Sequence, residues 1–349
     1  MQNTNDCKVK DNTYLFSNEI VFRGHPDKVC DQISGAILDE CLKQDPFTRA
    51  GIEVVGGKKK IFITGELTTK AKINIRNIVK RVLSDIGYNH KKYKIIIDLS
   101  KQSPDIALGV DNDGAGDQGI IYGYACNDTS KYLPLAMVIL KEFAQQYDNL
   151  RKLKPYVFLP DGKAQITGVY NKRKLKRINT FVINYQNSEM LRDKTDKVVI
   201  ALAKKICAKY KITVDRFVVN NSGKFALGGF EADSGLTGRK IVVDTYQGFA
   251  RHGGGNMNGK DPTKIDLSAS YKARDIAKRL LIANKLKWCE VQLSYVIGGG
   301  KPLAIYITSD RGVIVPDESL FDECTPARMI SDLKLREPQY ENKASFGHF

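Results

Sequence analysis

The chain has 349 residues, 42% of them hydrophobic and 27% charged, with a formal net charge of +16 at pH 7. This composition predicts a water-soluble globular protein of two or three domains. It excludes a membrane-spanning protein, because no stretch approaches the roughly 18 consecutive apolar residues that a span requires. The polar first 13 residues lack the apolar centre of a signal peptide and predict a disordered lead-in.

The seven cysteines, at positions 7, 30, 41, 126, 207, 289 and 324, show neither CxxC spacing nor a disulfide framework. They predict reduced thiols, several of them buried, in a cytoplasmic protein. The four histidines, at positions 25, 90, 252 and 348, do not cluster with cysteine, which argues against a zinc site. A metal would instead be bound by oxygen, as Mg²⁺ is by one or two carboxylates and substrate phosphates.

The net charge has two explanations. Lysine-rich runs at 58–60, 90–94 and 172–177 are of the kind that contacts nucleic acid. Alternatively, lysine simply occupies solvated positions in a chain that is also rich in Asn, Ile and Tyr. The runs are scattered and few aromatic residues lie among them, which favours the second explanation and argues against nucleic acid as a partner.

Helix and strand patterns alternate along the chain. Apolar residues at 29, 33, 37 and 41 share one face of a helix over 29–42, and Pro26 and Asp27 suit its first turn. Strands are predicted at 61–64 and 93–99, a helix at 133–146, a hairpin of strands 165–170 and 179–185, a helix at 190–210 and a strand at 217–220. The last part of the chain predicts strands at 240–244, 290–295 and 304–308 and a helix near 266–286.

Three successive blocks, each mixing strands with one or two helices, predict an α+β fold of three lobes. We place an N-terminal lobe at 14–113, a central lobe at 114–226 and a C-terminal lobe at 227–349, after the lead-in at 1–13. The segment 102–116 is dense in Gly and Asp, and a loop of this length is typical of a functional or a disordered segment.

Two segments rich in glycine and basic residues, 235–240 and 248–264, follow each other closely. They place three consecutive glycines among basic side chains: Arg239, Lys240, Arg251, His252, Lys260 and Lys264. Glycine lets a backbone amide approach an anion, and fixed cations bind phosphate charge. A flexible, solvated basic loop is the alternative, but the recurrence of the pattern favours a polyphosphate site.

Candidate metal-binding and cleft-lining residues are acids beside glycine or at strand ends. Asp27 follows His25 at the start of the predicted first helix, where the spacing supports a Mg²⁺ ligand and a helix cap equally. Five further acids could line a cleft, although each alone fits a turn residue better: Glu53, Glu66, Asp117, Asp161 and Asp233.

Seven segments occur in order along the chain: GHPDKVCDQIS (24–34), TGELTT (64–69), KQSPDI (101–106), GAGDQG (114–119), DGKAQ (161–165), GLTGRKIVVDTY (235–246) and ARHGGG…GKDPTK (250–264). Together they resemble the signature segments of the S-adenosylmethionine synthetase (methionine adenosyltransferase) family over nearly the whole chain. The resemblance implies similar lobes with mixed sheets in a pseudo-threefold arrangement. It also implies that methionine sulfur attacks C5′ of ATP and displaces tripolyphosphate, which is hydrolysed to pyrophosphate and phosphate.

The resemblance further implies two Mg²⁺ per site and K⁺, and a homodimer or dimer of dimers with active sites at the subunit interface. Catalytic roles fall on His25, Lys163, Arg239 and Lys260. Further ATP and phosphate contacts fall on Asp161, Lys224, Phe225, Asp233, Lys240 and Asn256. Methionine contacts fall on Glu66, Gln102, Asp117, Asp233 and Lys264. The Mg²⁺ ligands are Asp27 and, as a weaker match, Asp266, and the K⁺ ligand is Glu53. The gating loop contains Gln102, Ser103, Pro104, Asp105, Gly109 and Asp111.

The chain departs from the family pattern at several positions. Arg23 stands where an acid usually precedes GHPDK, Gly162 replaces an alanine, and Lys224 replaces an arginine, which loses the planar fork. Asn256 also differs from the family pattern, at the first residue of the segment NMNGK (256–260). These departures leave a catalytically inactive nucleotide-binding homologue, or a regulatory partner of an active subunit, as the alternative to an active synthetase.

Overall fold

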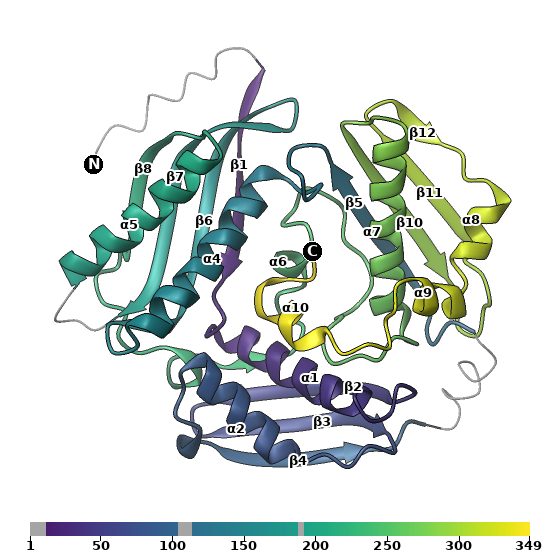
Figure 1. Cartoon of the computed structure of the whole chain (residues 1–349), viewed down its shortest axis with the longest axis horizontal. Coiled ribbons are helices and arrows are strands. Elements are labelled where there is room, and N and C mark those ends of the chain that lie inside the picture. The colour runs from purple at the N-terminus through teal and green to yellow at the C-terminus, as the bar shows by residue number, and fades with distance from the viewer. Residues whose placement is uncertain (1–11, 104–113, 188–191) are drawn as a thin grey trace.

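The computed structural model describes residues 12–103, 114–187 and 192–349, and three four-stranded sheets carry the fold (Figure 1). The first sheet has the order β1 (Thr13–Val21), β6 (Phe158–Asn171), β7 (Lys174–Asn187) and β8 (Val214–Val219). The second has the order β4 (Lys94–Ser100), β3 (Lys60–Thr68), β2 (Arg49–Gly57) and β9 (Gly235–Leu236). The third has the order β12 (Gly312–Ile314), β11 (Ala304–Ser309), β10 (Trp288–Tyr295) and β5 (Gly119–Cys126).

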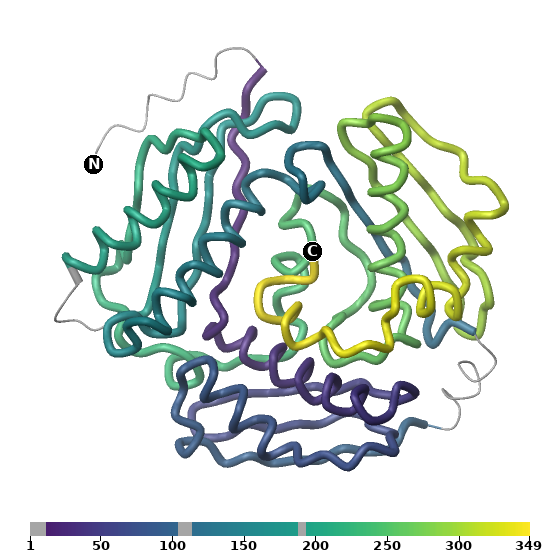
Figure 2. Tube along the Cα trace, in the orientation of Figure 1, coloured from purple at the N-terminus to yellow at the C-terminus, as the bar shows by residue number. Residues whose placement is uncertain are grey.

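The sheets combine segments that are distant in sequence, as the colours along the trace show (Figure 2). β1 pairs with β6, β5 pairs with β10, and β9 pairs with the edge of β2. Parallel pairs join β3 to β4 and β7 to β8, whereas the other pairs are antiparallel. The predicted α+β fold of three lobes is therefore confirmed, with mixed first and second sheets and an antiparallel third sheet.

The helices cover one face of each sheet and fill the centre between the lobes (Figure 1). α1 (Pro26–Leu42) and α2 (Ile75–Ile86) cover the second sheet, and α4 (Leu135–Leu153) and α5 (Arg192–Lys209) cover the first. α7 (Ile265–Ala283), α8 (Glu318–Glu323) and α9 (Pro326–Asp332) lie on the third sheet. α6 (Ile241–Asp244) and α10 (Tyr340–Phe346) lie near the centre, and two 3₁₀ turns occupy His90–Lys92 and Gly229–Glu231.

Local sequence explains most of these elements. α1 begins where His25 caps it and Pro26 takes its first position, and α2 runs from an Asn74 cap to Gly87 in the left-handed conformation. In β2, alternate residues Ala50, Ile52 and Val54 are buried, which places the side chains between them on the opposite face.

The predicted helices at 29–42, 133–146, 190–210 and 266–286 are confirmed as α1, α4, α5 and α7. The predicted hairpin is confirmed as β6 and β7, whose turn holds Lys172 and Arg173 at positive φ. The predicted strand at 240–244 is wrong, because these residues form the short helix α6. The β-branched run Ile241–Val243 predicts a strand locally, but the helical turn directs Asp244 into a buried ion pair with Lys28.

Each sheet packs its own hydrophobic core against its helices. The six cysteines in the described ranges are buried and form no disulfide. No helix within those ranges is long and apolar enough to cross a membrane.

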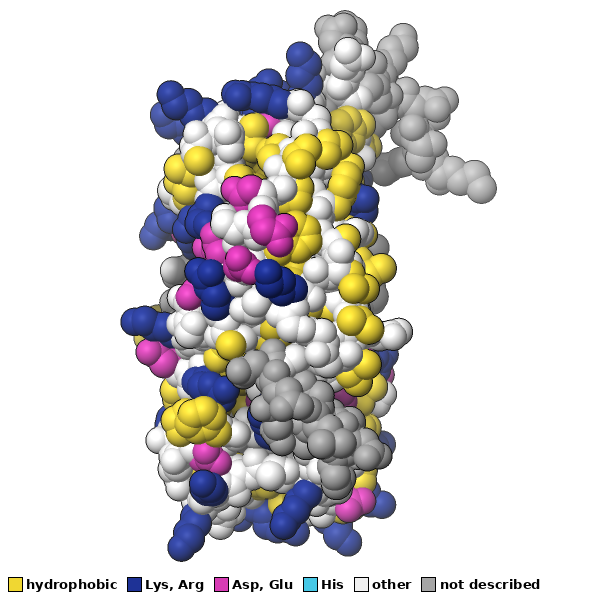
Figure 3. All heavy atoms as spheres, turned by 90° about the vertical axis from the view of Figure 1, so that its right-hand side faces the viewer, with side chains coloured by type: hydrophobic (Ala, Val, Ile, Leu, Met, Phe, Trp, Pro, Cys, Tyr) yellow, Lys and Arg dark blue, Asp and Glu magenta, His cyan; other side chains and the backbone are white. Residues whose placement is uncertain are grey.

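The sheet faces turned away from the helices carry exposed hydrophobic side chains. Near the third sheet these are Val296, Ile297, Leu303, Tyr306, Val313 and Val315. Figure 3 views the molecule from the right-hand side of Figure 1, where the third sheet lies, and shows hydrophobic side chains along one edge of the surface. An exposed apolar face of this kind is typical of a protein-protein interface.

Candidate functional site

The start of α1 brings a histidine and a carboxylate to the edge of the second sheet. His25 Nδ1 accepts a hydrogen bond from the Asp27 amide at 3.2 Å, so the imidazole caps the helix. The Asp27 side chain is 2% exposed, and its Oδ1 accepts from the Leu236 amide at 3.0 Å. Both residues are therefore held in place by backbone groups.

Two basic side chains from the 235–240 segment meet the same carboxylate. Lys240 Nζ lies 2.5 Å from Asp27 Oδ2, and an Arg239 guanidinium nitrogen lies 3.6 Å from Oδ1. The backbone before Arg239 is also held in place, because Asp31 Oδ1 accepts a hydrogen bond from the Gly238 amide at 2.9 Å. Gly238 has φ +79°, and a Cβ there would lie 2.6 Å from the Asn256 side chain, so only glycine fits.

His25 also lies close to residues of β6 and of the loop before β9. Burial, Lys240 and Lys163 lower the pKa of His25 to about 4, although Asp27 and Asp233 oppose the shift. Burial raises the pKa of Asp161 to about 6, although its Oδ2 accepts from the Gly229 amide at 2.7 Å. We call the following group the first cluster: His25, Asp27, Asp161, Lys163, Asp233, Arg239 and Lys240.

A second group lies on the face of the second sheet opposite to α1. Lys264 Nζ donates to Glu66 Oε1 at 2.7 Å, and Gln102 Nε2 donates to the same oxygen at 3.2 Å. Three of the five predicted methionine-binding residues, Glu66, Gln102 and Lys264, are thus in contact. Glu66 stands opposite Gly51 across the β2–β3 ladder, where a Cβ would lie 3.2 Å from its Cγ.

Lys260 and Asp266 extend this group. Lys260 Nζ lies 2.6 Å from Asp266 Oδ2, while Asp266 Oδ1 accepts from the Gly255 amide at 2.7 Å. Burial raises the pKa of Glu53, and the nearby Lys260 opposes that shift. We call the following group the second cluster: Glu53, Glu66, Gln102, Lys260, Lys264 and Asp266. Within the described ranges no hydrogen bond or ion pair joins the two clusters.

The remaining predicted residues lie around these clusters. Lys224 is exposed, and the half-buried Phe225 accepts at its carbonyl from the Asn187 amide at 2.9 Å. Asp117 is exposed and accepts from the adjacent Gln118 amide. Asn256 bonds to the backbone of Asn258, which closes a turn two residues before Lys260. Ser103 is described, whereas Pro104, Asp105, Gly109 and Asp111 of the predicted gating loop lie outside the described residues.

The donor set fits Mg²⁺ better than a softer metal. In the part of the chain that the structure describes, no three His, Cys, Asp or Glu side chains gather into a ready-made metal cage. Asp27 and Asp266 instead offer one carboxylate each, and each now faces a lysine ammonium. Mg²⁺ is usually bound by one or two carboxylates, and substrate phosphates supply further ligands.

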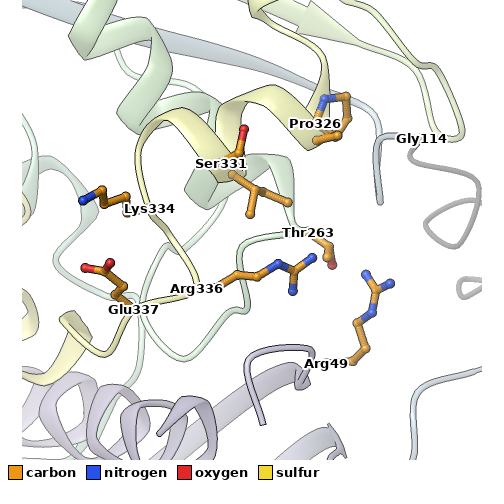
Figure 4. Close-up of a pocket in the computed structure, with 10 residues that line it drawn as sticks. Arg49, Gly114, Thr263, Pro326, Ser331, Lys334, Arg336 and Glu337 are labelled. Carbon is orange, nitrogen blue, oxygen red and sulfur yellow. The ribbon is translucent and has the colours of Figure 1, made fainter.

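A pocket of about 380 Å³ lies elsewhere, between the start of β2 and the segment after α9 (Figure 4). Arg49, Thr263 and Arg336 are among its lining residues, and none of its described lining belongs to either cluster. The two clusters therefore lie apart from this pocket.

A buried ion-pair group, which the sequence did not predict, lies behind the first cluster. Lys28 Nζ lies 2.7 Å from Asp244 Oδ1 and 3.1 Å from Asp31 Oδ2, and all three side chains are at most 4% exposed. Burial opposes the charge on Lys28, but Asp244 and Asp31 outweigh it and raise the Lys28 pKa. A lysine and an acid three positions apart in α1 were the available signal.

Arg23, which departs from the family pattern, connects three helices. Its guanidinium donates to Asp85 at 2.7 Å, to Asp148 at 3.3 Å and to Gln32 at 2.8 Å. These partners lie on α2, α4 and α1, so the arginine ties the segment before His25 to two lobes.

We expect Arg23→Ala to lower the free energy of unfolding by about 1–3 kcal/mol, because it leaves a largely buried Asp148 and Gln32 without this partner. Urea denaturation measures the change. Arg81→Ala is the matched control, since Arg81 pairs with Glu341 but is 48% exposed, and it should cost less than about 1 kcal/mol. Equal losses in the two variants would contradict the buried role of Arg23.

The lowered pKa of His25 makes a prediction about stability and pH. The folded value of about 4 lies below the unfolded value of 6.5, so the unfolded chain binds more protons between these pH values and stability falls as pH falls. His25→Asn keeps a good helix cap but cannot titrate. Between pH 6.5 and 4 the wild type should lose about 2–3 kcal/mol more than this variant. Thermal melting of the two proteins at a series of pH values measures this difference. If the imidazole titrated normally, the stabilities of the two proteins would fall equally with pH.

Three family models match in succession: the S-adenosylmethionine synthetase N-terminal domain over residues 13–106, the central domain over 112–225 and the C-terminal domain over 227–349. The chain is 41% identical to the S-adenosylmethionine synthase of Thermosynechococcus vestitus, over 96% of this chain and 92% of the relative. It is 40% identical to the S-adenosylmethionine synthase of Clostridium tetani, over 96% of this chain and 94% of the relative. It is 41% identical to the S-adenosylmethionine synthase of Trichormus variabilis, over 96% of this chain and 91% of the relative.

Proposed function

This chain belongs to the S-adenosylmethionine synthetase family, and from that premise we propose that it makes S-adenosylmethionine from ATP and methionine. The sulfur would attack C5′ of ATP and displace tripolyphosphate, which is then hydrolysed to pyrophosphate and phosphate. The observation that carries the proposal is the convergence of Arg239 and Lys240 on Asp27 beside a neutral His25. This chemistry needs alignment of the reacting atoms and neutralisation of the leaving group rather than a protein nucleophile.

His25 is arranged to donate a hydrogen bond. Its pKa of about 4 keeps the imidazole neutral near pH 7, and Nδ1 already accepts from the Asp27 amide. A neutral imidazole carries one proton, so that proton lies on Nε2. We propose that Nε2–H donates to the oxygen that leaves C5′, where negative charge develops.

The basic residues would hold the leaving polyphosphate. Arg239 is 48% exposed and Lys163 is exposed, so both side chains are free to reach a bound nucleotide near His25. Lys240 and Lys260 now neutralise Asp27 and Asp266 and would exchange these carboxylates for phosphate oxygens. Asp161, which accepts from the Gly229 amide, would contact the nucleoside together with Lys224 and Phe225, and Asn256 would add a phosphate contact.

Family membership is consistent with metal dependence. We propose that Asp27 and Asp266 hold one Mg²⁺ each and that Glu53 holds K⁺. When bound, Mg²⁺ offsets phosphate charge. Backbone amides position the two carboxylates: the Leu236 amide donates to Asp27, and the Gly255 amide donates to Asp266.

We propose that the second cluster binds methionine. Glu66 attracts the ammonium group and Lys264 the carboxylate, and their 2.7 Å contact places the two charges at the spacing of an amino acid head group. Asp117 and Asp233 would contribute from neighbouring loops, and the predicted loop 102–116 would gate the site.

The two clusters would face each other across a subunit interface, in a homodimer or a dimer of dimers. Two observations support this assembly: among the described residues of one chain no hydrogen bond or ion pair joins the clusters, and the sheet faces away from the helices expose hydrophobic side chains. The lobe boundaries at residues 113/114 and 226/227 remain part of the proposal.

Mass spectrometry tests the function directly. The pure protein incubated with ATP, methionine, Mg²⁺ and K⁺ should form S-adenosylmethionine. Nucleotide binding in calorimetry without product would instead favour an inactive homologue, although none of the relatives gives evidence for that alternative. Omission of Mg²⁺ and of K⁺ in separate reactions identifies which ions are required.

A further inference from the structure

A buried chain of hydrogen bonds runs from the last residues of the described chain to the phosphate-binding segments. His348 Nε2 lies 3.1 Å from Asn258 Oδ1, and Asn258 Nδ2 lies 3.3 Å from Asp244 Oδ2. Asp244 in turn accepts both short bonds from Lys28. His348, Asn258 and Asp244 are all at most 6% exposed, so these bonds are shielded from bulk solvent.

The direction of each hydrogen bond follows from the chemistry of the groups. The Asp244 carboxylate can only accept, so the Asn258 amide must turn its NH₂ group toward it and its oxygen toward His348. His348 Nε2 therefore carries the proton. Nδ1 is then the acceptor for the Tyr271 hydroxyl at 2.7 Å. Burial together with Lys28, Lys343 and Lys141 holds the pKa of His348 well below its usual range, which agrees with this neutral form.

The chain of bonds ends at both basic segments. Asn258 stands two residues before Lys260, and its backbone is tied to Asn256. Asp244 belongs to α6, and its amide donates to the Lys240 carbonyl at 2.8 Å. The His348 amide donates to the Asp244 carbonyl at 2.9 Å, so this histidine contacts both the Asn258 segment and the Asp244 segment.

We propose that His348 and Asn258 are positioning residues, which hold in place both the segment that carries Lys240 and the segment that carries Lys260. The proposal rests on the proposed function, since it assigns phosphate binding to these two lysines. His348 and Asn258 are buried, at 6% and 5% exposed, and we assign neither of them a contact with substrate. They act because a single donor at Nε2 fixes the Asn258 amide, which spans the gap to Asp244.

The surrounding packing allows His348 to be changed without release of the segment. Phe349 stacks on Tyr246 with ring centroids 5.1 Å apart and an interplanar angle of 6°. Lys141 Nζ donates to the Gly347 carbonyl at 3.1 Å. These contacts do not involve the imidazole, so they continue to hold residues 347–349 in place when His348 is changed.

The test compares His348→Asn with His348→Gln. The glutamine amide nitrogen reaches the place of Nε2 and can donate to Asn258, whereas the shorter asparagine reaches only the place of Nδ1. We expect kcat to fall about 10–100-fold in His348→Asn and to return to within about 3-fold of wild type in His348→Gln. The KM for methionine should change less than about 2-fold in both, since Glu66 and Lys264 are untouched. Equal kcat values in the two variants would overturn the proposal.

Amide hydrogen exchange gives a readout that does not depend on activity. Residues 236–240 and 255–260 should exchange faster in His348→Asn than in His348→Gln at equal melting temperature. If the wild type makes no S-adenosylmethionine, the proposed function fails, but exchange still decides whether His348 orders the two segments. Unchanged exchange in both segments refutes the positioning role.

Asn258→Asp covers the case in which the His348 variants do not fold. The new carboxylate still accepts from His348 but repels Asp244, so only the second bond is lost. We expect a fall of about 10–100-fold in kcat and faster exchange over residues 236–240. Wild-type values for both measurements would contradict the proposal.

Discussion

Lys260→Ala is expected to lower the rate of S-adenosylmethionine formation by about 10²–10³-fold, the loss that follows removal of one fixed electrostatic donor. Lys260 Nζ is 2.6 Å from Asp266, and the lysine backbone pairs with Gly51 of β2, so the ammonium has a defined position beside the glycine-rich segment. The effect should fall on kcat, because the leaving polyphosphate gains charge at C5′ cleavage. Initial rates at saturating ATP and methionine measure it.

Lys260→Arg and Lys278→Ala are the controls for this variant. Arginine keeps the charge and should recover part of the rate, although its planar fork does not match a single ammonium. Lys278 lies on α7 over the Tyr132 ring, away from both clusters, and its removal should leave the rate within about 2-fold of wild type. A near-wild-type rate in Lys260→Ala would remove the phosphate role from this residue.

Two inactive variants, one altered in each cluster, are expected to restore activity when their subunits are mixed. Lys163→Ala changes the first cluster and Lys260→Ala the second, and each homodimer should be reduced by about 10²-fold or more. In a heterodimer one site combines both altered clusters, while the other combines two intact ones. Since random mixing makes half of the dimers mixed, activity should recover to about a quarter of wild type.

This experiment separates a shared site from a site within one chain. If both clusters of the same chain formed one site, every chain in the mixture would stay impaired and no activity would return. The wild type diluted until it dissociates should lose activity in parallel with its dimer population, which analytical ultracentrifugation follows. Activity in an isolated monomer would contradict the shared site.

The elements with a strong periodic pattern could be predicted from sequence. The apolar spacing of α1, with Pro26 in its first turn, gave both its type and its start. By contrast, α6 was predicted as a strand, because Ile241 to Val243 are β-branched and nothing nearby in sequence indicates that Asp244 must reach Lys28. Strands β1, β2 and β5 went unpredicted, and β1 and β5 find their partners more than 140 positions away along the chain.

The candidate site divides in the same way. The sequence by itself determined the family, the α+β class and the residue types of the phosphate site, because long ordered motifs carry these and chemistry restricts glycine and basic residues to few roles. Only the tertiary structure decided which of them meet: Arg239 and Lys240 at Asp27, Lys264 and Gln102 at Glu66, and His348 at Asn258. The physical reason is that these contacts join residues up to 213 positions apart, and burial sets their charges and hydrogen bonds, which no local pattern in the chain encodes.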